Sequence, residues 1–137
     1  MIILDTHVLV WLVHGSPRIG ATAKRLIDRA GLKNEIFVSA ITPIEIGMLV
    51  AKSRLSLSKD VLDWVNEALA QPGISLLPML PEIAVASTRL PGSPHGDPAD
   101  RVTIASARHL GAPLVTADRK ILAYSRQGHL QAANAEA

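Results

Sequence analysis

The sequence predicts an α/β fold in three layers, with a central, mainly parallel sheet of four to five strands flanked by helices. Short apolar runs alternate along the chain with longer segments of helical spacing, a pattern typical of parallel strands joined by crossover helices. The first run, Ile2 to Leu4, is continuously apolar, as expected of a strand buried on both faces of a parallel sheet. With 137 residues, 48% of them hydrophobic and 19% charged, the chain has the size and composition of one folded domain.

The expected strands are four short apolar runs, and the turn at Gly128 would allow a brief fifth strand near Leu130. Beyond that point small and polar residues predominate, and chain ends without anchoring contacts tend to fray. We therefore expect residues 1–131 to form the domain and residues 132–137 to be a disordered tail. The four main strands are expected at residues 2–4, 35–39, 74–77 and 114–116.

Capping residues mark the helices between these strands. Thr6 can cap the first helix, Gly31 is a natural stop for the second, and Ser58 opens the fourth. Thr42 and Glu45, with Pro43 between them, form a capping box for the third. A loop rich in Pro and Gly covers residues 91–96. Helices are expected at residues 6–14, 21–30, 42–54, from 58 to near 72, and at 81–90, 97–110 and 118–124.

Composition restricts the environment and the site chemistry. No apolar run approaches the ~20 residues that span a bilayer, and no secretion signal precedes the first strand, so we expect a cytoplasmic protein without a membrane partner. The absence of cysteine excludes disulfides and thiolate metal sites. The sequence pI of 9.3 favours a polyanionic partner, although weakly.

Four acidic residues follow the predicted strands or begin the helices after them: Asp5, Glu45, Asp100 and Asp118. The carboxyl ends of parallel strands share one edge of a sheet, where ligands bind. Two carboxylates ~4 Å apart repel by about 4 kcal/mol at an effective dielectric near 20. Convergence at this edge would therefore require a hard divalent cation, Mg²⁺ or Mn²⁺, which prefers oxygen ligands.

Each acid also has a purely structural interpretation. Glu45 completes a capping box, Asp97 and Asp100 fit the cap and first turn of a helix, and Asp118 fits the cap of the last helix. Asp5 is harder to explain as a cap, because Thr6 could take that role. The shared sheet edge is what favours a site formed by all four.

Four motifs follow one another along nearly the whole chain. They are Leu4-Asp5-Thr6-His7-Val8-Leu9, Ser39-x-x-Thr42-x-x-Glu45-Ile46, Asp97-Pro98-Ala99-Asp100-Arg101 leading into Ile104-Ala105-x-Ala107, and Leu114-Val115-Thr116-Ala117-Asp118. Together they resemble the successive motifs of PIN domains, most closely those of the VapC toxins of bacterial toxin–antitoxin pairs. Each motif alone is weak, and their order makes the resemblance specific.

The resemblance implies a Mg²⁺-dependent ribonuclease that is restrained by a small cognate antitoxin and commonly dimeric. It implies metal ligation by Asp5 and Asp100, with Glu45 and Asp118 completing the pocket. Supporting roles fall to three residues: Thr6 and Thr116 through their hydroxyls, and Asp97 as a second-shell ligand or, as we favour, a helix cap. His7 stands where many relatives carry asparagine, and Ala99 where the turn often has a bulkier residue.

Basic residues are the expected source of RNA affinity. Aromatic residues make up 3% of the chain, so base stacking is not the main binding mode. Trp11 and Trp64 lie on apolar helix faces and are expected in the core or a dimer interface. His7 could reach the pocket, whereas the other histidines form no metal-binding repeat and are expected as surface or core residues: His14, His95, His109 and His129. Phosphate contacts are expected from Lys52, Arg54, Arg101 and Arg119.

Three functions therefore remain open. The leading one is metal-dependent hydrolysis of RNA, in which a metal-activated water attacks the phosphorus while a second ion or Arg101 steadies the departing oxygen. The second is an inactive module of the same fold that binds RNA or protein. The third, an aspartyl phosphatase or phosphoacceptor, is disfavoured because His7 stands where one such class carries a second aspartate.

Overall fold

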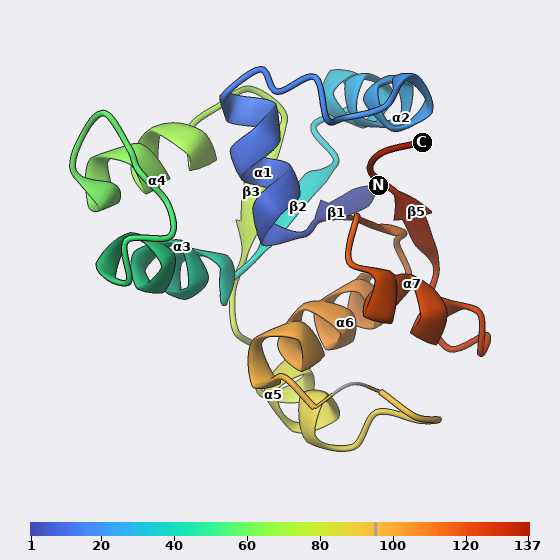
Figure 1. Cartoon of the computed structure of the whole chain (residues 1–137). Helices are drawn as coiled ribbons and strands as arrows, with labels where there is room; N and C mark the ends of the chain where they lie inside the picture. The colour runs from blue at the N-terminus through green and yellow to red at the C-terminus, as the bar shows by residue number, and fades with distance from the viewer. Residues whose placement is uncertain (95) are drawn as a thin grey trace.

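The chain folds into three layers, with a parallel sheet between two groups of helices (Figure 1). The computed structural model describes residues 1–94 and 96–137, so the expectation for His95 lies outside the described residues. Within these residues there are five strands in the order β3-β2-β1-β4-β5, and every neighbouring pair is parallel. The predicted fold class is confirmed. The strands are β1 (Ile2–Leu4), β2 (Ile36–Ser39), β3 (Ile74–Leu77), β4 (Leu114–Thr116) and β5 (Ala132–Asn134).

Alternation of side chains along the strands divides the core in two. Ile2 and Leu4 of β1 pack into one apolar cluster, and Ile3 between them packs into the other, as the two-residue period of a strand requires. The first cluster includes side chains from α1 to α4 and the second includes side chains from α5 to α7. The helices are α1 (Thr6–Val13), α2 (Ala21–Leu32), α3 (Thr42–Ala51), α4 (Val61–Leu69), α5 (Pro81–Thr88), α6 (Pro98–Leu110) and α7 (Arg119–Ser125).

Two helix boundaries differ from the sequence prediction. Gly31 does not end α2 but lies inside it, and Asn34 takes the left-handed conformation just beyond the helix. A Cβ built on Gly73 would lie 2.7 Å from the carbonyl oxygen of Gly31, so these two glycines lie at a close approach of the backbone. Helix α4 begins after Asp60, whose side chain accepts from the backbone N–H of residue 62 at 3.0 Å, and not at Ser58.

The end of the chain is ordered, which corrects the expectation of a disordered tail from residue 132. Ala132–Asn134 form β5, in register with β4, and Ala135 is fully buried. The carbonyl oxygen of Ala137 accepts hydrogen bonds from the backbone N–H groups of Thr22 and Ala23 in the first turn of α2. Hydrophobicity is a poor guide to such a strand, because its stability comes from backbone pairing and not from large side chains.

No helix in the described part of the chain is long and apolar enough to cross a membrane.

Candidate active site

Asp5 lies directly after β1 and is 4% exposed. Its Oδ1 accepts a hydrogen bond from the backbone N–H of Thr6 at 2.9 Å, and its Oδ2 accepts one from the hydroxyl of Thr116 at 2.7 Å. The structure assigns the cap of α1 to Asp5, so the expectation that Thr6 is the cap is wrong. Asp5 has the extended backbone of an N-cap, whereas Thr6 is already the first helical residue.

Glu45 lies one turn into α3, and its side chain contacts α1. The hydroxyl of Thr6 donates to Glu45 Oε1 at 2.6 Å and shares a second hydrogen bond, of 2.9 Å, with the hydroxyl of Thr42. A capping box would instead join Thr42 and Glu45 to each other's backbone N–H groups. Helix α3 has Ile41 at its N-cap and no side-chain cap bond. The capping-box interpretation is therefore wrong, because both side chains point at Thr6.

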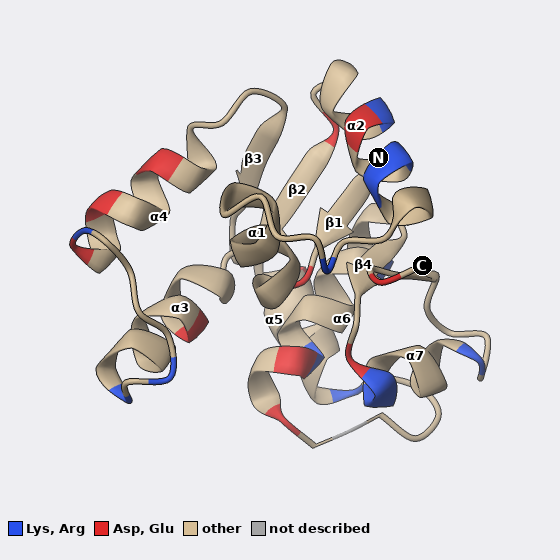
Figure 2. Cartoon of the chain, turned by 45° about the horizontal axis from the view of Figure 1, so that its top comes forward, with Lys and Arg blue, Asp and Glu red and all other residues tan. Residues whose placement is uncertain are grey.

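Burial and neighbouring acids both change the pKa of Glu45. The pKa of this carboxyl is raised from 4.5 to about 7, mainly by burial. The hydrogen bond from Thr6 opposes that rise, and three negative charges add to it, those of Asp5, Asp100 and Asp97. Carboxylates from β1, α3 and the start of α6 thus act on one another, and Figure 2 shows acidic positions on these elements around the same edge of the sheet.

Asp97 and Asp100 begin α6 as the sequence predicts. Asp97 is the N-cap, and its Oδ1 accepts from the backbone N–H groups of Ala99 at 2.8 Å and Asp100 at 3.4 Å. The cap role that the sequence favoured for Asp97 is confirmed. Its charge also contributes to the raised pKa of Glu45, so capping and a position beside the acids coexist in one residue.

Thr116 links Asp5 to Asp118. Its fully buried hydroxyl donates to Asp5 and accepts from the backbone N–H of Asp118 at 3.0 Å. Asp118 caps α7, with Oδ1 accepting from the N–H groups of Lys120 and Ile121. Thr116 therefore connects Asp5, at the end of β1, with Asp118, at the start of α7.

The donor set fits a hard divalent cation. Carboxylate oxygens are the ligands that Mg²⁺ and Mn²⁺ prefer. Burial raises the pKa of Glu45 most and the neighbouring carboxylates raise it further, so a cation beside Glu45 would favour its charged form. Within residues 1–94 and 96–137, no three His, Asp or Glu side chains are already arranged closely enough to hold a metal ion. Asp5, Glu45 and Asp100 are the residues that would hold it, with Asp118 beyond Thr116.

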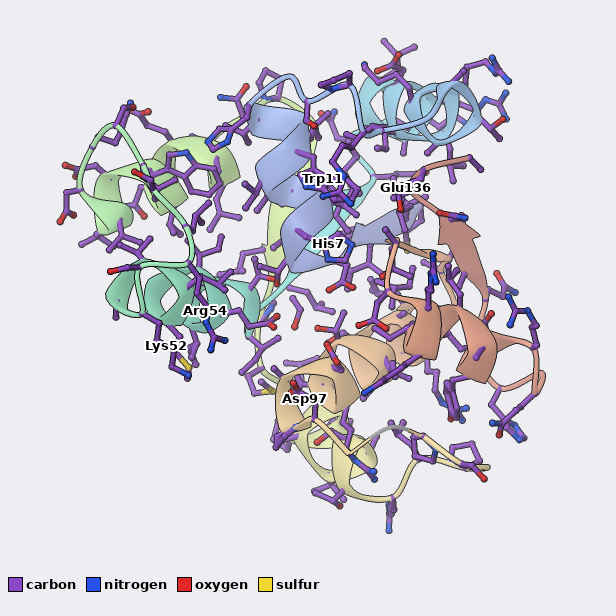
Figure 3. All side chains as sticks on the ribbon, in the orientation of Figure 1. His7, Trp11, Lys52, Arg54, Asp97 and Glu136 are labelled. Carbon is purple, nitrogen blue, oxygen red and sulfur yellow. The ribbon has the colours of Figure 1, made fainter. Side chains whose placement is uncertain are left out.

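The basic residues predicted to bind phosphate lie in different settings. Arg101 is half-buried, and its Nε donates to the carbonyl oxygen of Ser87 at 2.8 Å, which ties α6 to α5. Arg119 is exposed in the first turn of α7. Lys52 and Arg54 are exposed just beyond α3, where Figure 3 shows them close together. The structure adds no phosphate contact for any of them, so that role stays a prediction.

His7 reaches the site, which the sequence left open. Its Nε2 accepts from the backbone N–H of Ala117 at 3.0 Å, and its Nδ1 lies 3.7 Å from Asp5 Oδ2. Because Nε2 is an acceptor, the proton of the neutral ring is on Nδ1, facing Asp5. His7 therefore joins the two strand ends, those of β1 and β4, that carry Asp5 and Asp118.

The sequence analysis missed Arg18, which lies beside this histidine. Its Cζ is 4.1 Å from the ring centroid of Trp11, and the Trp11 ring makes an edge contact with His7 at 5.0 Å between centroids. Trp11 is half-buried, whereas Trp64 is in the core as expected, with its Nε1 donating to His14. Sequence spacing could not have revealed this contact, because Trp11 lies in the first helix and Arg18 lies beyond the break at Gly15, so no helical periodicity relates them.

Comparison with known proteins identifies the family. The model of the PIN domain matches residues 2–127. The chain is also 34% identical over 120 residues to ribonuclease VapC22 of Mycobacterium tuberculosis (strain ATCC 25618 / H37Rv), a match that covers 88% of each protein. This chain belongs to the PIN-domain family. The resemblance to VapC ribonucleases that the four motifs indicated is thereby confirmed.

Solved structures share the fold of this PIN domain. VapBC2 from Rickettsia felis, bound to a DNA fragment from their promoter, matches with a TM-score of 0.67 and 19% identity, over 98% of both chains. FitAcB from Neisseria gonorrhoeae matches with a TM-score of 0.66 and 22% identity, over 98% of this chain and 97% of the other. At these sequence identities the structural similarity shows the fold alone.

Proposed function

We propose that this PIN domain is a Mg²⁺-dependent endoribonuclease, also able to use Mn²⁺, and the toxin of a VapBC-type toxin–antitoxin pair. The observation that carries the proposal is the raised pKa of Glu45, which burial and the charges of Asp5, Asp97 and Asp100 produce. A carboxylate with a perturbed pKa beside other acids, at the carboxyl edge of a parallel sheet, is typical of a functional site. The identity to a ribonuclease over 88% of the chain supports the same conclusion.

The residues divide the work as follows. Asp5 and Asp100 hold the cation, and Glu45 and Asp118 complete the acidic pocket. Thr6 and Thr116 fix the orientation of Glu45 and Asp5 through hydroxyl donors. When bound, Mg²⁺ supplies charge neutralisation at the phosphate and a more acidic water as the nucleophile.

The basic residues would bind the RNA backbone around this pocket. Lys52, Arg54 and Arg119 are exposed and free to contact phosphates. The guanidinium of Arg101 adjoins Asp100 in sequence but already donates to Ser87. A bound cation or Arg101 would steady the departing oxygen.

Substitution of the acids tests the proposal. Asp5→Asn and Asp100→Asn should abolish Mg²⁺-dependent cleavage of RNA while the circular dichroism spectrum stays that of the parent. Asp60→Asn is the matched control, because Asp60 caps α4 with an exposed side chain outside the acid cluster, and should cut at the parent's rate. Cleavage at that rate by both site variants would show that the site is misassigned.

The alternative function is a catalytically inactive PIN-like module that binds RNA or protein. It is favoured by one observation, that no three described His, Asp or Glu side chains already surround a common point. Calorimetry with Mn²⁺ separates the two functions. The nuclease should show a binding site that is lost in Asp5→Asn and Asp100→Asn, whereas the inactive module should show none.

Partners follow from the same proposal. The small cognate antitoxin should bind this chain and suppress cleavage when the two are co-expressed. We also propose a homodimer in the cytoplasm, supported by large apolar side chains that are at least 40% exposed on neighbouring elements and that include Ile44, Met48, Leu62 and Met79. Light scattering should give twice the mass of 14.6 kDa; a monomer mass would contradict the dimer and leave the catalytic site untouched.

A further inference from the structure

A pocket lies beside the acid cluster, on the side of Asp118. It has a volume of about 350 Å³, within the size range of small-ligand sites. Asp118 belongs both to this pocket and to the predicted acid set, and His7 stands between the pocket and Asp5. Figure 3 shows three of its side chains, His7, Trp11 and Glu136, close together beside α1. The lining residues are His7, Trp11, Arg18, Ala117, Asp118 and Glu136.

Arg18 is the cation of this pocket and is held in a defined orientation. Its guanidinium stacks on the ring of Trp11 at 4.1 Å, which fixes one face and leaves its N–H edge for other partners. Arg18 Nη2 lies 3.6 Å from Glu136 Oε2, and the side chains are 60% and 48% exposed. An ion pair this exposed and this long is weak. Glu136 is therefore a counter-ion that a better acceptor can replace.

A phosphate group is such an acceptor. The planar guanidinium offers paired N–H donors that match phosphate oxygens, and charge-assisted bonds of this kind are strong. Asp118 and Glu136 are the acidic residues of the pocket, and Arg18 is its Lys or Arg side chain, so Arg18 is the group there that attracts a phosphate. His7 and Asp118 line the pocket, and His7 Nδ1 lies 3.7 Å from Asp5 Oδ2, so the pocket adjoins the end of β1 that carries Asp5.

We propose that Arg18, held against Trp11, binds the phosphate of the RNA nucleotide next to the cleaved bond, and that Glu136 is the resting counter-ion displaced on binding. This inference rests on the proposed function, because it takes RNA as the substrate at the acid cluster. It makes Arg18 a substrate-binding residue and the loop between α1 and α2 part of the RNA-binding surface.

In the competing interpretation, the ion pair between Arg18 and Glu136 serves only to stabilise the packing of the end of the chain. The two interpretations differ in what they predict for variants of Arg18 and Glu136. If Arg18 binds phosphate, Arg18→Ala weakens RNA binding and Glu136→Gln strengthens it. If the ion pair is only structural, both variants lower the melting temperature by similar amounts and neither changes the salt dependence of RNA binding.

Fluorescence anisotropy with a short labelled single-stranded RNA in EDTA, across a series of salt concentrations, tests this directly. Arg18→Ala should weaken binding about tenfold and reduce the log–log salt slope by ~0.7, the value for one lost contact to a single strand. Arg18→Lys should keep the slope and weaken binding about threefold, because the charge remains but the planar fork is lost. Glu136→Gln should strengthen binding about twofold.

Arg29→Ala is the matched control, because Arg29 is an exposed arginine of α2 outside the pocket, and should bind as the parent does. An unchanged salt slope in Arg18→Ala, weaker binding by Glu136→Gln, or an absence of RNA binding by the parent would each overturn the inference.

Cleavage assays in Mg²⁺ separate this inference from the proposed function. If the parent binds RNA through Arg18 but does not cut it, the proposed function fails and the binding role of Arg18 stands. If the parent cuts and Asp5→Asn does not, while Arg18→Ala cuts with an unchanged KM, the inference fails and the nuclease stands. When both are correct, Arg18→Ala raises KM more than it lowers kcat.

Discussion

Replacement of Glu45 by glutamine should stabilise the protein at alkaline pH. Glu45 has a pKa raised from 4.5 to about 7, so between these values the folded state holds more protons than the unfolded state. The stability that this group contributes therefore falls as the pH rises through that window and is lowest above about pH 7. Glutamine keeps the acceptor for the Thr6 hydroxyl but has no charge to desolvate.

The size of the effect follows from the pKa values. A difference between 4.5 and about 7 corresponds to about 3.4 kcal/mol at about 1.36 kcal/mol per tenfold change in proton affinity. Glu45 is only half-buried, and solvent screening reduces this to about 1–2 kcal/mol. For a domain of this length that is a rise in Tm of about 3–8 °C at pH 8. At pH 4.5, where the folded carboxyl is protonated, the variant and parent should melt together.

Thermal melts in EDTA at pH 4.5, 6 and 8 measure this difference, with the exposed Glu82 substituted by glutamine as a control that should show no rise. Addition of Mg²⁺ at pH 8 should raise the Tm of the parent more than that of Glu45→Gln, because the cation relieves a repulsion that the variant lacks. The electrostatic reasoning would be refuted if the Glu45→Gln variant were less stable than the parent at pH 8, or if its Tm differed from that of the parent by the same amount at all three pH values.

Two further substitutions test the parts that hold the site. Thr116→Val removes the hydroxyl that donates to Asp5 and should cost about 1–3 kcal/mol in urea unfolding together with most of the cleavage rate; a variant as stable as the parent would show that this bond is dispensable. Gly20→Ala would place a Cβ 2.1 Å from the carbonyl oxygen of Ala137 and should destabilise by about 1–3 kcal/mol, whereas Gly47→Ala, inside α3 with no atom near the new Cβ, should stabilise slightly.

The apolar runs of the sequence were sufficient to predict four of the five strands, but not β5. Several helix starts were predicted wrongly because the prediction used local capping residues. Each of the first four strands could be predicted because most of its residues are apolar, although in β3 only the end residues, Ile74 and Leu77, are buried. Helix starts were predicted from capping residues within the same helix. That logic succeeded at Asp97 and Asp118 and failed at Thr42, whose hydroxyl bonds to Thr6 from a different helix.

The candidate site could be predicted in composition and only partly in geometry. The rule that strand ends share an edge placed Asp5, Glu45 and Asp100 in one site, and the charges of Asp5 and Asp100 do act on Glu45, whereas their role as metal ligands stays a prediction. The rule could not reveal that Arg18 lines a pocket with Asp118, because that depends on how the loops after β4 and α1 pack against the end of the chain. Tertiary contacts of this kind have no local signal.

The way in which the acids are held argues that the site is kept for a cation. Elsewhere in the described chain, several exposed carboxylates are paired with basic side chains, in Lys24–Asp28, Lys59–Glu67 and Arg18–Glu136. Neither Asp5 nor Glu45 has a Lys or Arg partner within the described residues, and both accept instead from threonine hydroxyls. A hydroxyl orients a carboxylate without neutralising it. Had these acids served only to stabilise the fold, a Lys or Arg partner would have lowered the pKa of Glu45, which burial raises most and the neighbouring carboxylates raise further. Without such a partner, the charge of Glu45 stays available to a cation.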